Sequence, residues 1–232
     1  MNTLHRQFGI LFFSFALLWL PSLAMAVSNA VVQKETEEYL LNLKYPEGFA
    51  AVEVNTKVKE YIKDKRSEFM KELVDDAGVS PDAPGKTSLT INYKIVYNAK
   101  NALSIRFDRS IYHRGAAHPA HFVEVLNFLN NKEISLSDLF KQGADYLNPI
   151  ASYCSKEITA KDISDAELIK EGTAPTVDNY STWYFTTKGI AVVFNTYQVA
   201  AYVYGEQVVP VPLSIFASVL KPELAKSLWG NA

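Results

Sequence analysis

The chain has 232 residues and a formal net charge of −2, with Lys+Arg 23 against Asp+Glu 25. This balance excludes the clustered basic surface of a nucleic-acid-binding protein, so no nucleic acid is expected as a partner. The single cysteine, Cys154, excludes an internal disulfide, so the fold must depend on its hydrophobic core. We expect Cys154 to be a small buried apolar group on a helix.

The first 26 residues have the pattern of a secretory signal peptide. His5 and Arg6 give a basic start, residues 8–20 are apolar, and Ala24-Met25-Ala26 is a small-x-small cleavage site. The apolar run is shorter than the roughly 20 residues of a membrane span, although an uncleaved anchor is the alternative. Cleavage near Ala26 would leave a periplasmic or secreted protein without a stable membrane span.

The N-terminal half predicts one long helix among several strands. Residues 27–34 are expected to be a loose leader, and residues 35–45 a strand. A helix over 55–74 is expected to begin at Asn55, a good capping residue, and to turn a charged face to solvent. Alternating apolar residues predict three more strands, over 89–97, 103–107 and 122–129, of which the first two form a hairpin.

The C-terminal half predicts short helices and further strands. The helices are expected over 137–140, 146–159, 164–170 and 213–220, and the strands over 183–187, 190–194 and 208–211. The strand over 190–194 has no polar residue and should be covered on both faces. Pro210 and Pro212 place the last strand at a sheet edge, and Pro222 is expected to stop the final helix.

These elements indicate an α+β fold with a largely antiparallel sheet, because the strands cluster in hairpins that helices interrupt. A long N-terminal helix and the short helices should pack on the sheet. The predicted division is a signal peptide over 1–26 and two closely associated subdomains, over 27–108 and 109–232.

Three histidines lie within nine residues of one another in the middle of the chain. His113, His118 and His121 could bind zinc, and Glu124 could complete the set of ligands. Their spacing, with Pro119 between them, is not that of a helical pair of ligands. The alternative is an exposed loop in which His118-Pro119 sets the turn, and this interpretation is favoured because a metal site needs converging geometry.

Arginines near these histidines could form a cationic rim for an anionic ligand. Arg106, Arg109 and Arg114 would do so if the hairpin projected them together. A solvated strand face is the favoured alternative.

Large aromatic rings are concentrated between residues 180 and 204. Such rings offer apolar area with a polar tip, so they suit binding surfaces and can stack on sugars, and core packing is an equal alternative. Tyr197 and Tyr202 have the strongest claim to a binding role, because they fall in a loop. The full set is Tyr180, Trp183, Tyr184, Tyr197, Tyr202 and Tyr204.

The chain resembles the family of RsiV-type anti-sigma factors and PdaC-type proteins in three ordered blocks. The first is Leu43-x-Tyr45-Pro46, and the second runs from Gly115-Ala116-Ala117-His118-Pro119 to the Ile134–Phe140 segment. The third is Phe194-x-x-Tyr197-Gln198-Val199-Ala200-x-Tyr202-x-x-Gly205, followed by Val208–Pro212. The resemblance implies a PdaC-like N-terminal subdomain and an RsiV-like C-terminal domain, both of unknown function. It does not include the catalytic deacetylase domain.

What the resemblance implies about function is recognition at the cell envelope. The favoured hypothesis is an exported, non-catalytic binding protein whose ligand is a lysozyme-like protein or a peptidoglycan-type glycan. Its binding residues would be Tyr197, Tyr202, Tyr204, Trp183, His118 and Arg114.

The alternative hypothesis is a zinc-dependent hydrolase or deacetylase of cell-wall glycan. Zinc would be its cofactor, bound by His113, His118 and His121, whereas the favoured hypothesis needs no cofactor. The deacetylase domain of PdaC-like proteins has a His-x3-His-Pro motif, and here His113 and His118 are one residue too far apart.

Overall fold

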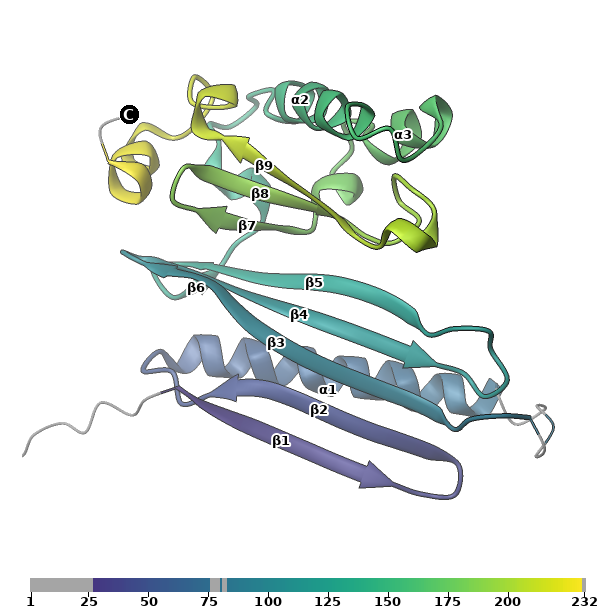
Figure 1. Ribbon diagram of the computed structural model, residues 1–232. Coiled ribbons are helices and arrows are strands. Elements are labelled where there is room, and N and C mark those ends of the chain that lie inside the picture. The colour runs from purple at the N-terminus through teal and green to yellow at the C-terminus, as the bar shows by residue number, and fades with distance from the viewer. Residues whose placement is uncertain (1–26, 76–79, 81–82, 231–232) are drawn as a thin grey trace, which may run out of the picture.

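The computed structural model describes residues 27–75, 80 and 83–230, and its elements form two stacked sheets with helices on their outer sides (Figure 1). The predicted signal peptide, residues 1–26, lies outside the described residues. Within them, one six-stranded sheet has the order β1-β2-β3-β4-β5-β6 and one three-stranded sheet has the order β7-β8-β9. The predicted α+β class is confirmed.

The first sheet is antiparallel except for one pair. Its strands are β1 (Ser28–Glu35), β2 (Tyr39–Glu47), β3 (Thr87–Ala99), β4 (Ala102–Tyr112), β5 (Ala120–Leu129) and β6 (Lys132–Glu133). β2 and β3 are parallel, which requires a crossover connection, and the helix α1 (Val52–Asp75) supplies it. The predicted hairpin is confirmed as β3 and β4.

The core of the first sheet lies between its strands and α1. Val58, Ile62 and Phe69 recur at helical spacing on one face of α1 and are buried. They belong to the same apolar cluster as Leu43 and Ile91 on the strands. Burial of each such side chain contributes about 1.5–3 kcal/mol, which holds the crossover helix on the sheet.

The prediction that Asn55 caps this helix is wrong, because α1 already begins at Val52. The Asn55 side chain instead accepts hydrogen bonds from the N–H groups of Gly48 and Phe49, each at 3.0 Å. It also donates to the carbonyls of Phe49 at 2.6 Å and Ala51 at 3.0 Å. One amide therefore satisfies the turn that leads from β2 into the helix.

The prediction of a loose leader over 27–34 is also wrong, because most of this segment forms β1. β1 pairs with β2 along its whole length, from Ser28 opposite Glu47 to Glu35 opposite Leu40. Only two of its residues, Ala30 and Val32, are half-buried, and the others are exposed. An edge strand of this kind has too little apolar alternation to be recognised in the sequence.

The second sheet lies above β3, β4 and β5 and is covered by helices on its other face (Figure 1). It contains β7 (Trp183–Thr186), β8 (Gly189–Phe194) and β9 (Gln207–Pro212). Every residue of β8 is buried, as predicted. β9 is an edge strand within the described residues, as its prolines predict.

The helices over the second sheet are α2 (Leu147–Thr159) and α3 (Ala166–Gly172). Cys154 lies on the buried face of α2, with no exposed surface. Burial raises the pKa of its thiol to about 12, so the group stays protonated and apolar. The prediction of a small buried apolar side chain is confirmed.

Buried polar groups join the two sheets. Ser104 Oγ on β4 donates to Asn127 Oδ1 on β5 at 2.6 Å and accepts from the N–H of Phe185 at 3.1 Å. The Asn127 amide donates to the carbonyl of Trp183 at 2.7 Å. Both side chains are almost fully buried. Removing one partner would leave buried groups unsatisfied, so these bonds fix β7 on the first sheet.

The end of the chain differs from its predicted pattern. The helix expected over 213–220 is only one turn, η5 (Leu213–Ile215), and Leu220 then pairs with Phe140 in an isolated bridge. Pro222 was expected to stop a helix, but it begins α4 (Pro222–Leu224), which continues into η6 (Ala225–Trp229). The other short turns are η2 (Leu136–Leu139), η3 (Asp178–Tyr180) and η4 (Tyr202–Tyr204). In the described part of the chain, none of the helices has the length and apolar character needed to cross a membrane.

Candidate functional site

The third block of the family resemblance forms the loop between β8 and β9. Val199 and Ala200 are buried and anchor the middle of this loop. Gln198 Nε2 donates to the carbonyls of Gly172 at 3.2 Å and Asn179 at 3.1 Å. Gln198 Oε1 accepts from the N–H of Asn195 at 3.0 Å. These bonds give the loop one fixed shape.

Gly172 makes this anchoring possible. It is the last residue of α3, and a Cβ atom there would lie only 1.9 Å from the carbonyl oxygen of Gln198. No side chain fits at that distance unless one of the two backbones shifts. Glycine therefore lets the helix end and the β8–β9 loop pack backbone against backbone.

Asn195 ties the same loop to the first sheet. Its Oδ1 accepts from the N–H of Val123 at 2.6 Å, and its amide donates to the carbonyl of Val123 at 3.1 Å. The side chain thus pairs with the edge of β5 as another strand would. The sequence analysis missed Asn195 and Gln198, although two amides directly after a buried strand were a usable signal.

Tyr202 brings the β8–β9 loop against the loop between β4 and β5. Its hydroxyl donates to the carbonyl of Pro119 at 2.9 Å, and its ring stacks on His118 with centroids 3.9 Å apart. His118 Nδ1 lies 3.0 Å from the same carbonyl. The neutral histidine would donate there through Nδ1–H, leaving Nε2 free for a ligand.

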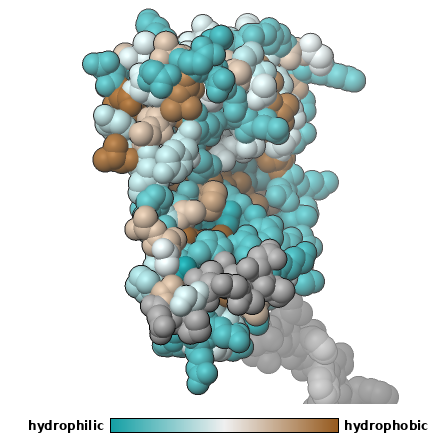
Figure 2. Space-filling view, turned by 90° about the vertical axis from the view of Figure 1, so that its right-hand side faces the viewer, coloured by the Kyte–Doolittle hydropathy of each residue, from teal (hydrophilic) through white to brown (hydrophobic). Residues whose placement is uncertain are grey.

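The rings of Tyr197, Tyr202 and His118 are in contact, and Tyr204 is exposed on the same β8–β9 loop; we call these four side chains the aromatic surface. Tyr197 is 58% exposed and lies 5.6 Å from Tyr202, while Tyr204 is 48% exposed. This end of the molecule faces the viewer in Figure 2, where apolar side chains stand singly on a mainly hydrophilic surface in the upper half. The aromatic surface is therefore amphipathic and not a purely apolar patch.

Tyr197 is held in an unfavourable backbone conformation. Its φ of +70° lies in the left-handed region, which costs a bulky residue about 1–2 kcal/mol. Gln198 and the buried Val199 beside it stabilise this conformation. Strain of this kind persists where the surrounding structure imposes it, and it is concentrated at functional positions.

An ion-pair cluster lies beside the aromatic surface. Arg106 pairs with Asp108 at 2.6 Å and with Glu206 at 2.7 Å. Burial alone would raise the pKa of Glu206, but the hydrogen bond from Arg106, a backbone hydrogen bond and nearby positive charge together outweigh it, and the pKa is lowered from its ordinary value. Glu206 is therefore ionised at neutral pH and secures the end of the loop to β4.

The structure brings together only part of the predicted binding set. Tyr197, Tyr202 and His118 are in ring contact, and Tyr204 is exposed on the same loop. The prediction for Trp183 is wrong, because its side chain is 1% exposed and packs in the core with Phe185. Strand alternation turned this ring inward.

The predicted cationic rim does not form. Arg114 follows β4 and packs beside the first residue of β3, where its backbone N–H donates to the Thr87 hydroxyl. Its guanidinium lies 3.5 Å from the carbonyl of Glu37. Arg106 and Arg109 point to opposite faces of β4. The favoured alternative, a solvated strand face, is not observed for them either, since both side chains are mostly buried in ion pairs.

The structure divides the three histidines between two places. His118 and His121 flank the ring of Tyr202, with centroids 3.9 and 6.1 Å away. His113 points to α1, where its Nε2 lies 3.7 Å from Glu72 Oε2. Glu124, the suggested fourth ligand, instead binds Lys65 and Arg109. Over residues 27–75, 80 and 83–230, no group of three or more His, Cys, Asp or Glu side chains could hold a metal ion.

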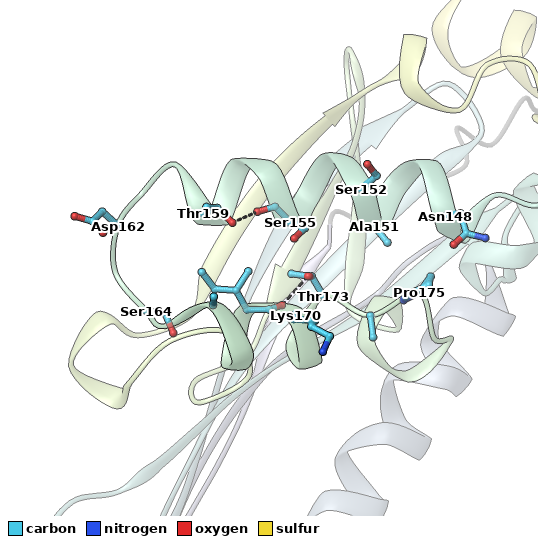
Figure 3. Close-up of a pocket in the computed structure, with 13 residues that line it drawn as sticks. Asn148, Ala151, Ser152, Ser155, Thr159, Asp162, Ser164, Lys170, Thr173 and Pro175 are labelled. Carbon is cyan, nitrogen blue, oxygen red and sulfur yellow. Dashed lines mark hydrogen bonds between the residues drawn. The ribbon is translucent and has the colours of Figure 1, made fainter.

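A separate hollow of about 450 Å³, away from the aromatic surface, lies between α2 and α3 (Figure 3). It is lined mainly by small and hydroxyl-bearing side chains, and Asp162 and Lys170 are the charged ones. The hydroxyls of Thr159 and Thr173 already donate to backbone carbonyls within their own helices. This hollow offers no aromatic ring for stacking, so the aromatic surface remains the stronger candidate.

Comparison with known proteins relates both parts of the chain to described families. Residues 32–121 match the family model described as deacetylase PdaC, and residues 137–214 match a protein family of unknown function, DUF3298. Both parts of the chain are therefore similar to PdaC/DUF3298-like proteins. The first match covers most of the six-stranded sheet, and the second contains the β8–β9 loop. The subdomain boundary predicted at residue 108 falls inside β4.

One similar protein is the peptidoglycan-N-acetylmuramic acid deacetylase PdaC of Bacillus subtilis (strain 168). It is 32% identical over 202 residues, which cover 85% of this chain but only 42% of that protein. The chain thus spans less than half the length of this relative.

Two solved structures share the fold. A DUF3298 family protein from Pseudomonas aeruginosa PAO1 has a TM-score of 0.68 at 14% identity, covering 90% of this chain and 98% of that chain. A DUF3298 member from Bacteroides fragilis NCTC 9343 has a TM-score of 0.61 at 18% identity, covering 88% and 98%. Both likenesses extend over the two sheets together.

Proposed function

We propose that this protein is an exported, non-catalytic binding protein of the cell envelope, and that the aromatic surface recognises peptidoglycan-type glycan. The observation that carries the proposal is that Tyr197 and Tyr204 are exposed on a loop whose third ring, Tyr202, is held by its hydrogen bond to Pro119 and its stacking on His118. Export would follow cleavage of the predicted signal peptide near Ala26. The relative from Bacillus subtilis is named for an activity on peptidoglycan, which supports this class of ligand.

The chemistry of the rings suits a sugar chain. Sugar rings have one face of C–H bonds, which packs on an aromatic ring, and hydroxyls at their margins. Tyr197 and Tyr204 offer ring faces with phenolic tips, and His118 offers a free ring nitrogen beside them. Because Tyr202 is already fixed by Pro119, little side-chain freedom is lost on binding, and this preorganisation raises affinity.

A lysozyme-like protein is the other ligand that the family resemblance implies. Exposed tyrosines also anchor protein interfaces, so the same surface could serve that role. The two ligands are separated by experiment, because a glycan would bind as purified sacculi in the absence of any protein partner.

The proposal is tested by co-sedimentation of the purified mature protein with peptidoglycan sacculi. Truncating an aromatic anchor removes about 1–2 kcal/mol of binding free energy, so Tyr197→Ala and Tyr204→Ala should each weaken binding about tenfold. The matched control is Tyr184→Ala, a half-buried tyrosine on β7 outside the aromatic surface. It should bind as the unaltered protein does.

Three results would contradict the proposal. The protein could fail to sediment with sacculi, or the two surface variants could bind as well as the control. Binding to purified lysozyme but not to sacculi would assign the aromatic surface to a protein partner.

A further inference from the structure

Both flanks of α1 carry positively charged side chains, but only on one flank are these side chains paired with carboxylates. On the flank next to β5 and β6, both lysines that line a hollow of about 450 Å³ are paired. Lys57 pairs with Glu60 at 3.0 Å and Glu133 at 3.5 Å, and Lys65 pairs with Glu124 at 2.9 Å. These cations are neutralised within the protein and need no ligand.

On the opposite flank, next to β1 and β2, three positively charged side chains have no carboxylate partner among the described residues. Lys59, Lys63 and Arg66 follow one another at helical spacing and are exposed. They line a groove of about 530 Å³ together with Val32 and other mainly apolar residues of the floor. Across the described ranges, none of the three forms an ion pair, and no carboxylate lines the groove. We call it the cationic groove.

The floor of the cationic groove is apolar. Leu43 and Ile62 are buried in the core, and Tyr45 packs against it. Met70 is 36% exposed at the rim. A surface with an apolar floor and three unpaired cations suits a ligand that is both apolar and anionic, and the chain as a whole, at −2, is not generally basic.

The groove lies beside an unprotected strand edge. Among the described strands, four stand at the ends of their sheets: β1, β6, β7 and β9. β6 has two residues, β7 has four, and β9 carries Pro210 and Pro212. Short strands and prolines are devices that block pairing at an edge. β1 has eight residues and no proline, so it alone of these four lacks such protection.

The hydrogen-bond pattern shows which amides of β1 face outward. The N–H of Thr36 donates to the carbonyl of Tyr39 at 2.9 Å, which places the hydrogen-bonded pairs at every second position from there. By antiparallel alternation, Val32 bonds inward to β2, while Val31 and Gln33 point their backbone groups away from the sheet. A further strand could therefore pair with β1 at Val31 and Gln33.

We propose that the edge of β1 and the cationic groove together dock an extended acidic peptide segment of a partner protein. The peptide would add to β1 as a seventh strand. Alternate side chains of that strand would face α1, so its carboxylates would meet Lys59, Lys63 and Arg66, and an apolar side chain would rest on the floor. Backbone pairing supplies affinity, and the cations select acidic sequences.

A second copy of this chain does not fit the surface. Antiparallel pairing of β1 with β1 of another copy about a two-fold axis would place both α1 helices on the same face. The unpaired cations of the two copies would then approach one another, and like charges at an interface are unfavourable. An acidic partner removes this repulsion.

The first test uses three synthetic peptides and the unaltered mature protein. One is an eight-residue peptide whose alternate residues, on one face of the strand, are glutamate, valine, glutamate and glutamate, with threonine between them. The second replaces each glutamate by lysine, and the third is the acidic peptide methylated on alternate backbone nitrogens. Fluorescence anisotropy should show binding of the acidic peptide and at least tenfold weaker binding of the other two, because one loses the charges and the other the strand hydrogen bonds.

The second test alters the protein. Lys63→Glu and Arg66→Glu should each weaken the acidic peptide about fivefold. The matched control is Lys71→Glu, an exposed lysine of α1 that does not line the groove. Gln33→Pro removes one outward N–H without a bond to β2, and it should weaken binding about fivefold while the thermal unfolding midpoint stays near that of the unaltered protein.

Several outcomes would overturn the proposal. Equal binding of the acidic and basic peptides, or of the methylated one, would remove the role of charge or of strand pairing. Sedimentation with phosphatidylglycerol vesicles that is lost in Lys63→Glu but kept in Gln33→Pro would assign the groove to a membrane surface. A concentration-dependent dimer abolished by Gln33→Pro would assign the edge to a second copy.

Discussion

Two groups of aromatic rings in the same stretch of chain differ in burial: one lies in the core and the other is exposed. Tyr180, Trp183 and Phe185 are each 1% exposed and form part of the core, whereas Tyr197 and Tyr204, a few residues further on, are 58% and 48% exposed. The residue types are nearly the same, so composition does not decide between them. Whether a ring is buried or exposed depends on the strand or loop that carries it.

The buried rings lie on β7 and next to it, where alternation points every second side chain into the core. The exposed rings lie on the β8–β9 loop, which is held by other residues. Gln198 and Asn195 bind backbone groups, and Val199 is buried, so the loop is ordered without burying Tyr197 or Tyr204 in the core. The rings are thereby left free for a ligand, and substitutions should separate the two groups.

The largest effect is expected where a core ring is removed. Trp183→Ala should lower the free energy of unfolding by about 3–5 kcal/mol, because it deletes a fully buried indole and leaves a cavity. Urea unfolding at neutral pH measures this, with Tyr184→Ala as the neighbouring control that is only half-buried. A loss below about 1 kcal/mol would show that Trp183 is not the core residue described here.

A smaller effect is expected where the loop is displaced without touching a ring. Gly172→Ala should destabilise the fold by about 1–3 kcal/mol, because the new methyl group overlaps the carbonyl of Gln198. It should also weaken sedimentation with sacculi, since the aromatic surface moves with the loop. Lys170→Ala, on the same short helix but exposed, is the control. Unchanged glycan binding in a destabilised Gly172→Ala protein would uncouple the loop from recognition.

A comparable but pH-dependent effect is expected at Glu124. Its carboxylate accepts from Tyr61 at 2.8 Å and pairs with Lys65 and Arg109, each at 2.9 Å. Burial alone would raise its pKa, but the hydrogen bond from Lys65 and the charge of Arg109 outweigh it, so the pKa is lowered from 4.5. The carboxylate therefore stabilises the fold above about pH 4.5, and this contribution is lost as the pH falls through the lowered pKa.

Glu124→Gln should accordingly be less stable than the unaltered protein by about 1–2 kcal/mol near pH 7. The difference should shrink as the pH falls through the lowered pKa, because the carboxyl group then becomes protonated in the folded chain as well as in the unfolded one. Thermal unfolding midpoints over this range measure it. A difference that stays constant with pH would contradict the ionised network.

The smallest effect on stability is expected at the aromatic surface itself. Tyr204→Ala should change the free energy of unfolding by no more than about 0.5 kcal/mol, as exposed positions generally do. The same variant is expected to weaken glycan binding about tenfold. A large loss of stability would place Tyr204 with the core rings and remove the contrast between the two groups.

Most of the fold could be predicted from local patterns. The alternation from Leu89 to Phe107 gave the β3–β4 hairpin, and the prolines of β9 gave its place at an edge. The parallel pairing of β2 with β3 could not be predicted, because it depends on the packing of α1 on distant strands. β1 escaped prediction because an exposed edge strand leaves almost no hydrophobic signal.

The candidate site was only half predictable. Loop position identified Tyr197 and Tyr202 correctly as exposed or partly exposed rings, but nothing local distinguished Trp183, whose inward direction follows from the sheet. The three histidines are neighbours in sequence, yet a turn of the chain sends His113 to α1 and His118 to Tyr202. Such separation depends on tertiary structure, which spacing does not encode.

The most direct test of recognition by the aromatic surface is an NMR titration of the labelled mature protein with a soluble disaccharide-peptide fragment of peptidoglycan. Saturable shifts should concentrate at Tyr197, Tyr202, Tyr204 and His118, while Tyr184 stays unchanged. No saturable shifts, or shifts concentrated in the hollow between α2 and α3, would contradict the account.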